Sequence, residues 1–280
     1  MFKITVIIPT FNRAHTICRA IDSVMAQTVS ADEIIIVDDG STDDTAERIK
    51  EFYPTLEYIY QSNKGVSSAR NKAILQAKNE WLAFLDDDDE WMPHKLEKQI
   101  HLLQKHPDLK LCHTEERWIR HGVRVNQMKK HRKAGGWIYQ NCLPLCAISP
   151  SSALVHKDLF DDVGLFREDL PACEDYDMWL KICSRYPVAY VEEECLIKYG
   201  GHEDQLSSKY WGMDRFRIDA LTDILSSGKL TIDDEKATRN ILQKKIQVFI
   251  KGAIKRNKVE EVEMYESLLV RLELGGGQNK

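Results

Sequence analysis

The chain has 280 residues, of which 43% are hydrophobic and 30% charged, and its formal net charge at pH 7 is −5. This composition is typical of a globular chain with one sizeable core and argues against a disordered protein. The mild negative charge argues against a general nucleic-acid binder, so no nucleic-acid partner is expected. Seven cysteines without a C-x-x-C pair indicate buried thiols in a reducing compartment rather than disulfides or a zinc site.

The first residues, MFKITVIIPTFN, include an apolar run that is too short for a signal peptide and is broken by Pro9. No later window approaches the roughly 20 apolar residues of a membrane span. A cytoplasmic location is therefore expected.

Three short runs are rich in β-branched or aromatic residues: ITVIIPT, EIIIVDDG and EWLAFLDDDD. They are predicted to be parallel strands buried on both faces. Helices are expected between them, at 14–28, with Ile17, Ile21 and Val24 on one face, and at 41–53. This alternation predicts a doubly wound α/β unit, in which ligands bind at the carboxyl ends of the strands.

The second half of the chain has a weaker pattern. Residues 110–140 are expected to be irregular and basic, whereas EDYDMWLKICSRY is predicted to be an amphipathic helix with Trp179, Ile182 and Tyr186 turned inward. The rest is helical in period and should fray at its end. The expected units are a globular domain at 1–210, with halves 1–110 and 111–210, a helical region at 211–274 and a flexible tail at 275–280.

Four consecutive aspartates, Asp86 to Asp89, follow the third predicted strand. Magnesium and manganese prefer such oxygen ligands, so a metal site is the favoured interpretation, with a solvated turn as the alternative. If the chain stayed extended, Asp86 and Asp88 would project to one side and Asp87 and Asp89 to the other. Asp89 is placed to cap a helix that begins at Pro93.

Two further polar segments lie near the predicted strand ends. In VDDGS, Gly40 is expected in a turn at positive φ, with Ser41 or Thr42 capping the next helix. A carboxylate at this edge could also accept the ring N–H of a pyrimidine or guanine. In SNKGVSSARNKAI, Arg70 could contact phosphate or base, and an ordinary exposed arginine is the alternative.

VIIPTFNR, IIIVDDGSTDDT, SNKGVSSARNKAI, FLDDDDEWMPHKL and EDYDMWLKI occur in this order over about residues 3 to 210. In order and spacing they resemble glycosyltransferase family 2, the inverting enzymes that use nucleotide-diphosphate sugars. The resemblance implies a GT-A fold, Rossmann-like with a mostly parallel sheet flanked by helices, and here a C-terminal helical appendage. It implies transfer from a donor, UDP-sugar in the first instance, to a hydroxyl of a saccharide or lipid-linked acceptor, as in surface polysaccharide synthesis.

The resemblance also implies roles for single residues. The nucleotide pocket would be formed by Thr10, Phe11, Asn12, Arg13, Asp39, Arg70, Asp86 and Asp87. Phe11 would lie against the base, and Asp39 would accept the uracil N–H. Asp88 and His202 would bind Mn²⁺ or Mg²⁺. Asp87 stands where the family commonly has Ser, and Gly200 stands in the place of a usual Arg.

Asp175 matches the catalytic base of the family, with Glu174 and Asp177 shaping its surroundings. Displacement at an anomeric carbon needs a carboxylate that removes the acceptor proton, while the metal stabilises the leaving diphosphate. Acids that merely interact with a helix dipole are the alternative for this segment.

Two other functions are compatible with parts of the pattern. A non-catalytic nucleotide-sugar binding module would not need both Asp88 and Asp175, which argues against it. An aspartyl-phosphate phosphatase is suggested by VDDGST, but its spacing differs by one from the Asp-x-Asp-Gly-Thr motif.

The basic stretch MKKHRKAGGWIYQ offers a possible acceptor surface. Trp137 or Tyr139 would lie against a sugar face, and the basic residues expected toward an anionic acceptor are Lys129, Lys130, Arg132 and Lys133. A solvated run of charge is the alternative.

A helix with two unlike faces is predicted over 241–258. Its apolar stripe comprises Leu242, Ile246, Phe249 and Ala253, and the opposite face carries Lys244, Lys251, Lys255 and Lys258. This helix could lie peripherally on the inner face of the membrane. Packing on the core or a homodimer contact is the favoured interpretation.

Overall fold

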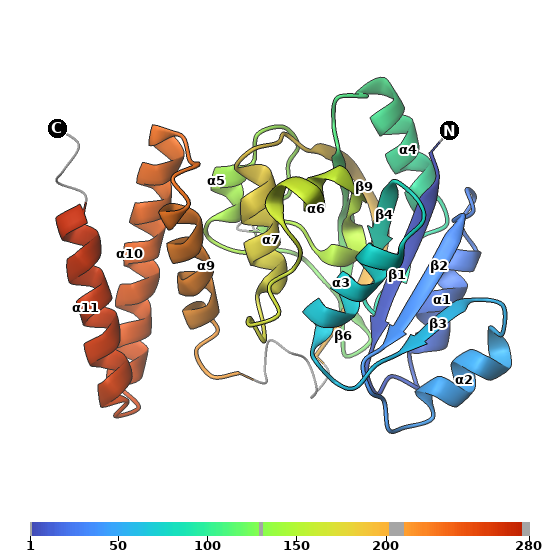
Figure 1. Ribbon diagram of the computed structural model, residues 1–280, viewed down its shortest axis with the longest axis horizontal. Helices are drawn as coiled ribbons and strands as arrows, with labels where there is room; N and C mark the ends of the chain where they lie inside the picture. Colours follow the sequence, from blue (N-terminus) through green and yellow to red (C-terminus); the bar gives the residue numbers. More distant parts are fainter. Residues whose placement is uncertain (1, 129–130, 202–209, 276–280) are drawn as a thin grey trace.

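The computed structural model describes residues 2–128, 131–201 and 210–275. Within these residues, nine strands form one mixed sheet in the order β3-β2-β1-β4-β8-β6-β9-β5, with β7 paired to β6 (Figure 1). The strands are β1 (Ile4–Thr10), β2 (Glu33–Asp38), β3 (Glu57–Tyr60), β4 (Trp81–Phe84), β5 (Glu90–Trp91), β6 (Leu111–Arg120), β7 (Val123–Val125), β8 (Leu154–His156) and β9 (Ala189–Gly200).

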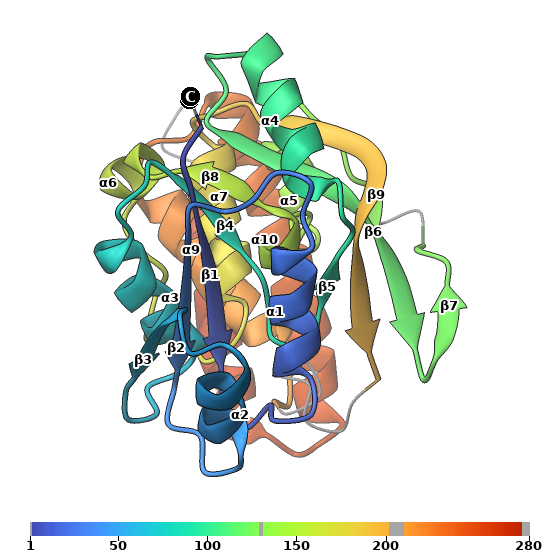
Figure 2. The ribbon, with the colours of Figure 1, turned by 90° about the vertical axis from the view of Figure 1, so that its right-hand side faces the viewer.

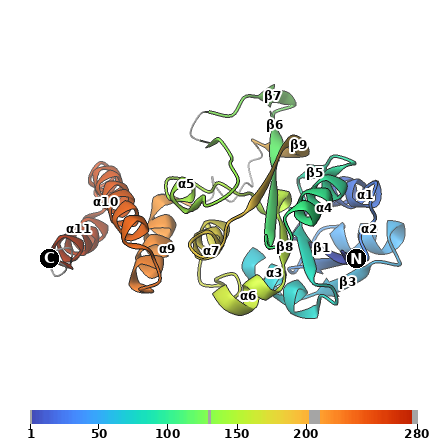
Figure 3. The same ribbon diagram turned by 90° about the horizontal axis from the view of Figure 1, so that it is seen from above.

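Helices cover both faces of the sheet. They are α1 (Ile17–Met25), α2 (Thr45–Phe52), α3 (Val66–Gln76), α4 (Lys95–Lys105), α5 (Tyr139–Cys142), the 3₁₀ helix η2 (Pro150–Ser152), α6 (Asp158–Val163), α7 (Glu174–Cys183), α9 (Asp214–Ser226), α10 (Ile232–Ile254) and α11 (Val259–Gly275). Helices α1, α2 and α4 share one apolar core with the sheet, and α3, α6 and α7 share the other (Figure 3). Because every residue of β1 is buried, the prediction of a strand covered on both faces is confirmed.

The parallel strands bring their carboxyl ends to one edge of the sheet. β1 pairs with β2 and β4 in parallel, with Thr10 opposite Asp38 and Ile7 opposite Phe84. In Figure 1 β1 and β2 end at the lower edge, and in Figure 2 β6 and β9 end at the same edge. The loops that follow β1, β2 and β4 therefore lie together.

The sequence predicts an irregular chain over residues 110–140, but the structure shows two strands there. Its first part forms β6 and β7, and β6 pairs along its length with β9. Charged side chains of β6 are matched across the ladder, since the Arg117 guanidinium donates to Glu194 Oε2 at 2.7 and 2.9 Å. A polar strand of this kind lacks the apolar run that identified β1, β2 and β4.

Helices α9, α10 and α11 pack side by side beyond α7 (Figures 1 and 3). The apolar stripe of α10, Leu242, Ile246, Phe249 and Ala253, is buried in the same core as α7, which confirms the packing interpretation. The lysines of the opposite face, Lys244, Lys251, Lys255 and Lys258, are exposed. No helix in the described ranges combines the length and apolar character needed to cross a membrane.

Candidate active site

The loop after β1 is tied to the loop after β2. Asn12 adopts a positive φ of 54°, its N–H donates to Ser41 Oγ at 2.9 Å, and its Oδ1 accepts the Thr42 N–H at 2.7 Å. Phe11, next to it, is 42% exposed although it lies among buried strand ends. The loop thus presents one aromatic side chain to solvent at the edge where the strands end.

Asp39 organises the segment that leads into α3. It is buried, and its carboxylate accepts from Gln61 Nε2 at 2.8 Å, from the Lys64 N–H at 2.9 Å and from the Gly65 N–H at 2.7 Å. A carboxylate has about four lone-pair sites, so three protein donors leave it capacity for one more.

Gly40 has a φ of 87°, as predicted for a turn, and an added Cβ would lie 2.8 Å from the Asn63 backbone nitrogen. The predicted caps Ser41 and Thr42 were wrong. Asp43 instead accepts the Thr45 N–H at the start of α2.

The four aspartates form a turn rather than an extended strand. β4 ends at Phe84, and the Asp89 N–H donates to the Asp86 carbonyl oxygen at 3.0 Å. The expected alternation of the side chains is therefore wrong. Asp89 does not cap α4 either, because its buried carboxylate accepts from Ser151 Oγ at 2.6 Å and from the Tyr199 N–H at 3.2 Å.

Four cations of the chain approach this turn. Arg70 donates to Asp86 at 2.7 Å, Arg13 Nε lies 3.4 Å from Asp87, Arg19 donates to the Asp88 carbonyl oxygen at 2.6 Å, and Lys198 Nζ lies 3.6 Å from Asp89. Lys198, on β9, was not foreseen as a site residue. Nothing in its local sequence distinguishes it, because its position depends on the pairing of β9 with β5 and β6.

These cations do not neutralise the turn evenly. Burial favours a raised pKa at Asp86, but the charges of Arg70 and Lys198 outweigh it and lower that pKa. Burial and the neighbouring Asp88 carboxylate raise the pKa of Asp87 to about 7, although Arg13 opposes them. The aspartates of the turn therefore differ in pKa.

Arg70 links the two halves of the site. It is 3% exposed and donates to Asp86 Oδ1 and to Glu174 Oε1, each at 2.7 Å. The guanidinium also lies over the Phe166 ring, 5.4 Å from its centroid. The alternative of an ordinary exposed arginine is therefore wrong, and α3, the aspartate turn and the start of α7 meet at one side chain.

Asp175 follows Glu174 in the first turn of α7 and is half-buried. Its Oδ1 accepts the Tyr176 N–H at 2.7 Å, and its Oδ2 accepts from the Cys146 thiol at 3.2 Å. Glu174, the residue before Asp175, is bonded through Arg70 to Asp86, which connects the start of α7 to the aspartate turn.

Asp177, also in the first turn of α7, has its own charged partners. It is buried and forms ion pairs with Lys181 at 2.7 Å and with Arg167 at 4.0 Å. Arg167 also pairs with Asp219 of α9 at 2.9 Å. Asp177 therefore links α7 to Arg167 and, through it, to α9, and its role beside Asp175 stays a prediction.

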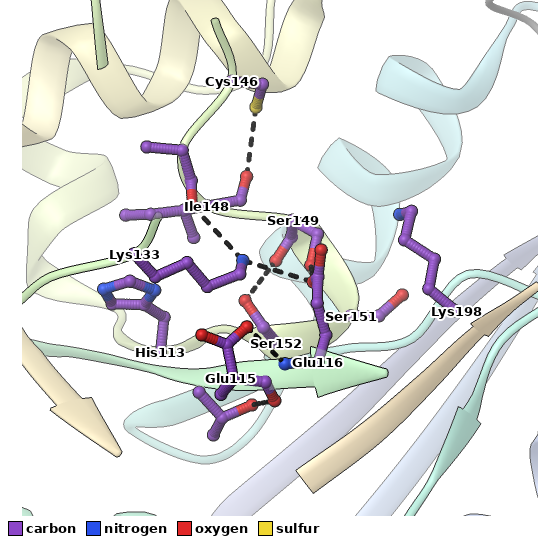
Figure 4. Close-up of polar contacts among 12 residues, drawn as sticks. His113, Glu115, Glu116, Lys133, Cys146, Ile148, Ser149, Ser151, Ser152 and Lys198 are labelled. Atoms are coloured by element: carbon purple, nitrogen blue, oxygen red, sulfur yellow. Dashed lines mark hydrogen bonds and ion pairs between the residues drawn. The ribbon is translucent and has the colours of Figure 1, made fainter. Parts of the chain in front are cut away.

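A second buried charge cluster, not foreseen from sequence, contains Glu116 and Lys133 (Figure 4). Glu116 Oε2 accepts from Ser149 Oγ at 2.5 Å and lies 3.2 Å from Lys133 Nζ. Burial opposes ionisation, but Lys133 and Lys198 lower the pKa of Glu116 to about 2. Lys133 is therefore an internal partner of Glu116, and its expected role toward an acceptor is wrong.

The other residues of the predicted acceptor surface differ in their exposure to solvent. Tyr139 is buried, with its hydroxyl 2.7 Å from Thr238 Oγ1, so it does not face a sugar. Trp137 is 71% exposed and Arg132 is exposed. Lys129, Lys130 and His202 lie outside the described residues.

Among the residues described, no three His, Cys, Asp or Glu side chains are grouped to hold a metal ion.

The fold is shared with solved glycosyltransferases. The Staphylococcus aureus TarS 1–349 structure in complex with UDP-GlcNAc superposes with a TM-score of 0.68 at 18% identity, over 95% of this chain and 91% of that one. The mannosyltransferase PcManGT from Pyrobaculum calidifontis, in complex with GDP-Man and Mn²⁺, gives 0.62 at 16% identity, over 97% and 84%. The predicted GT-A fold class is confirmed.

Proteins that are similar to the chain in sequence are also glycosyltransferases by name. An uncharacterized glycosyltransferase of Rickettsia felis is 32% identical over 213 residues, which cover 74% of this chain and 35% of the relative. The Escherichia coli UDP-Glc:alpha-D-GlcNAc-diphosphoundecaprenol beta-1,3-glucosyltransferase WfgD is 30% identical over 183 residues, 65% of this chain and 70% of the relative. The chain thus spans about a third of the Rickettsia felis protein. A family model described as glycosyl transferase family 2 matches residues 5–161, and the chain belongs to that family.

Proposed function

We propose that the chain is a metal-dependent inverting glycosyltransferase that moves a sugar from a nucleotide-diphosphate donor to a hydroxyl of a saccharide or lipid-linked acceptor. The observation that carries the proposal is the Asp86–Arg70–Glu174 junction, in which both contacts are 2.7 Å. It brings a half-buried carboxylate, Asp175, to the edge where parallel strands of a GT-A fold end. A transferase needs a base at that place, whereas a binding module does not.

The donor end is assigned to the loops after β1, β2 and β4. Phe11 would stack on the base, Asp39 would use its remaining lone-pair capacity for the ring N–H, and Thr10, Asn12 and Arg13 would line the pocket. A UDP-sugar is the proposed donor, because UDP-Glc occurs in the name of WfgD and UDP-GlcNAc is bound in the TarS structure. GDP-Man in PcManGT shows that the fold also accepts another base.

The proposed reaction is a single displacement. The acceptor oxygen forms a bond to the anomeric carbon while the bond from that carbon to the diphosphate oxygen breaks, which inverts the configuration. The acceptor proton passes to Asp175. Arg70 stays charged, since Asp86 and Glu174 raise its pKa although burial opposes them, so the junction keeps its geometry as Asp175 gains a proton.

The donor set fits Mg²⁺ or Mn²⁺. Such ions are commonly held by one or two carboxylates together with substrate phosphates, so a three-ligand protein cage is not needed. The match of the DDDD run to the metal motif of the family supports Asp88 as the ligand, with Asp86 and Asp87 toward the nucleotide. When bound, the ion would neutralise the leaving diphosphate. His202 stays a predicted ligand.

For the acceptor we propose a chemical class, a lipid-linked saccharide, and no particular molecule. WfgD is named for a diphosphoundecaprenol-linked saccharide, which supports a lipid-linked acceptor and a role in surface polysaccharide synthesis. Trp137, 71% exposed, stays the predicted sugar contact. Peripheral membrane contact through α10 would rest on its exposed lysines, because the apolar stripe of this helix is buried.

Asp175→Asn tests the proposal. The variant should bind UDP-glucose or UDP-GlcNAc as the wild type does, by calorimetry with Mn²⁺, but lose transfer by at least about a hundredfold, the low end for removal of a general base. Asp161→Asn, an exposed aspartate of α6, is the control. Near wild-type transfer by Asp175→Asn would contradict the assignment. Donor binding by the wild type without transfer or donor hydrolysis would favour a binding module, and turnover of a generic phosphate ester would favour a phosphatase.

A further inference from the structure

A short connection between α5 and η2, the 143–149 segment, contacts the first turn of α7. It carries Cys146, whose Sγ lies 3.2 Å from Asp175 Oδ2 and 3.1 Å from the Ile148 carbonyl oxygen. Burial and the Asp175 carboxylate raise the pKa of Cys146 well above its usual value. The sulfur therefore keeps its proton and acts as a donor.

The 143–149 segment is held by residues from several elements, of which Figure 4 draws Lys133 and Glu116. Its contacts are Tyr176 Oη to the Leu143 carbonyl oxygen at 2.6 Å, Lys245 Nζ to that of Pro144 at 2.9 Å, Lys133 Nζ to that of Ala147 at 3.3 Å, and Ser149 Oγ to Glu116 Oε2 at 2.5 Å. Three of the donors come from α7, α10 and the segment before α5, whereas Ser149 of the segment itself donates to Glu116 of β6. Cys146 thus sits on a backbone that is fixed on both sides.

The two contacts of Asp175 orient its carboxylate. The Tyr176 N–H holds Oδ1 at 2.7 Å, and this single bond leaves the carboxylate free to tilt about the Cβ–Cγ bond. The thiol has one hydrogen, which is shared between Asp175 Oδ2 at 3.2 Å and the Ile148 carbonyl oxygen at 3.1 Å. This shared bond limits the tilt of the carboxylate and leaves the other lone pair of Oδ2 for a hydroxyl. Glu174, the neighbouring acid, is oriented separately by Arg70.

We propose that Cys146 is a positioning residue for Asp175, and that the 143–149 segment is the element that presents its thiol. This inference rests on the proposed role of Asp175 as the base. It also gives the C-terminal helices a part in the reaction, because Lys245 of α10 holds the segment that carries Cys146.

Three substitutions of Cys146 distinguish the effect of its hydrogen-bond donor from the effect of its side-chain volume. Cys146→Ala and Cys146→Val remove the donor, and Val retains most of the volume, whereas Cys146→Ser retains a donor. The first two should lower kcat for transfer about tenfold, which corresponds to about 1.4 kcal/mol, and leave the donor KM and UDP affinity unchanged. Cys146→Ser should recover most of the lost kcat. Cys142→Ala is the matched control, because this buried thiol of α5 lies in the core.

The outcomes are distinguishable from failure of the proposed function. A kcat within twofold of wild type for both Cys146→Ala and Cys146→Val would overturn the inference. So would a Cys146→Ser variant as slow as Cys146→Val, since packing alone would then explain the loss. If Asp175→Asn itself transfers normally, the assignment of the base fails, whatever the Cys146 variants do. Should Cys146→Ala not fold, Cys146→Val and Cys146→Ser still give the comparison.

Discussion

The four adjacent aspartates are tolerated because each has a different environment. Asp86 is bonded to Arg70, and Asp89 accepts from Ser151 and lies near Lys198. These two carboxylates are committed to the structure of the turn. Asp88 contributes its carbonyl oxygen to Arg19, and its half-buried carboxylate raises the pKa of Asp87. Asp88 stays the residue proposed to bind the divalent cation.

Asp88→Asn should remove the metal dependence of nucleotide binding. In the wild type, UDP should raise the melting temperature only when Mn²⁺ or Mg²⁺ is present, because a ligand that binds the folded state alone stabilises it. The amide weakens the charge that holds the ion against the diphosphate. A thermal-shift series of UDP with and without Mn²⁺ measures this, with Asp44→Asn, an exposed aspartate, as control. An unchanged metal-dependent shift in Asp88→Asn would move the ion to Asp86 or elsewhere.

At the scale of elements, α4 docks on the sheet through a buried lysine. Lys95 is fully buried, its Nζ donates to Gln99 Oε1 at 2.8 Å, and it lies 3.9 Å from the centroid of the Trp91 ring. Gln99 in turn donates to the carbonyl oxygens of Cys112 and Ser152. Burial lowers the pKa of Lys95 to about 7, although the nearby Cys112 and Cys195 oppose the shift.

This lysine makes stability depend on pH. Between about pH 7 and 10.5 the unfolded chain binds a proton on Lys95 that the folded chain has released. The free energy of unfolding should therefore rise with pH in this window, by up to about 1.4 kcal/mol per unit from this group. Lys95→Met should flatten the rise in urea titrations at pH 7, 8 and 9, and Lys105→Met, exposed in the last turn of α4, should not. Equal slopes for wild type and Lys95→Met would refute the argument.

The elements that the sequence predicts well are those buried on both faces. β1, β2 and β4 appear as uninterrupted apolar runs because neighbouring helices cover them, and α1 shows its buried face as Ile17, Ile21 and Val24. β6 and β9 were not predicted because their charged residues are satisfied across the ladder. Arg117 and Glu194, which form such a pair, are 77 positions apart. Local periodicity carries no information about a partner at that distance.

At the scale of the whole molecule, the C-terminal helices belong to the main core. Ile246 is fully buried in that core, whereas Val248 on the same helix is 61% exposed. Ile246→Ala should therefore lower the free energy of unfolding by about 2–5 kcal/mol, and Val248→Ala by no more than about 0.5 kcal/mol. Urea denaturation measures both. Normal stability of Ile246→Ala together with loss of binding to anionic vesicles would instead favour insertion of the stripe into a membrane.

The candidate site was predictable only as a set of local motifs. The residues after β1, β2 and β4 and the start of α7 were identified, but their junction was not, because Arg70 and Glu174 are 104 positions apart. Lys133 was placed toward an acceptor since its neighbours are basic. Its actual partner, Glu116, lies on a strand that the sequence pattern did not reveal. Long-range pairing of charges decides these assignments.

The strand order has a consequence for the synthesis of the chain on the ribosome. β4 lies between β1 and β8, yet β8 begins at Leu154, long after β4 ends at Phe84. Lys198, the cation nearest Asp89, emerges later still. At about 5–20 residues per second, translation from the end of β4 at Phe84 to the start of β8 at Leu154 takes roughly 4–14 s. During that time β4 has an open edge in the middle of the future sheet, and its unpaired backbone groups can pair with another chain.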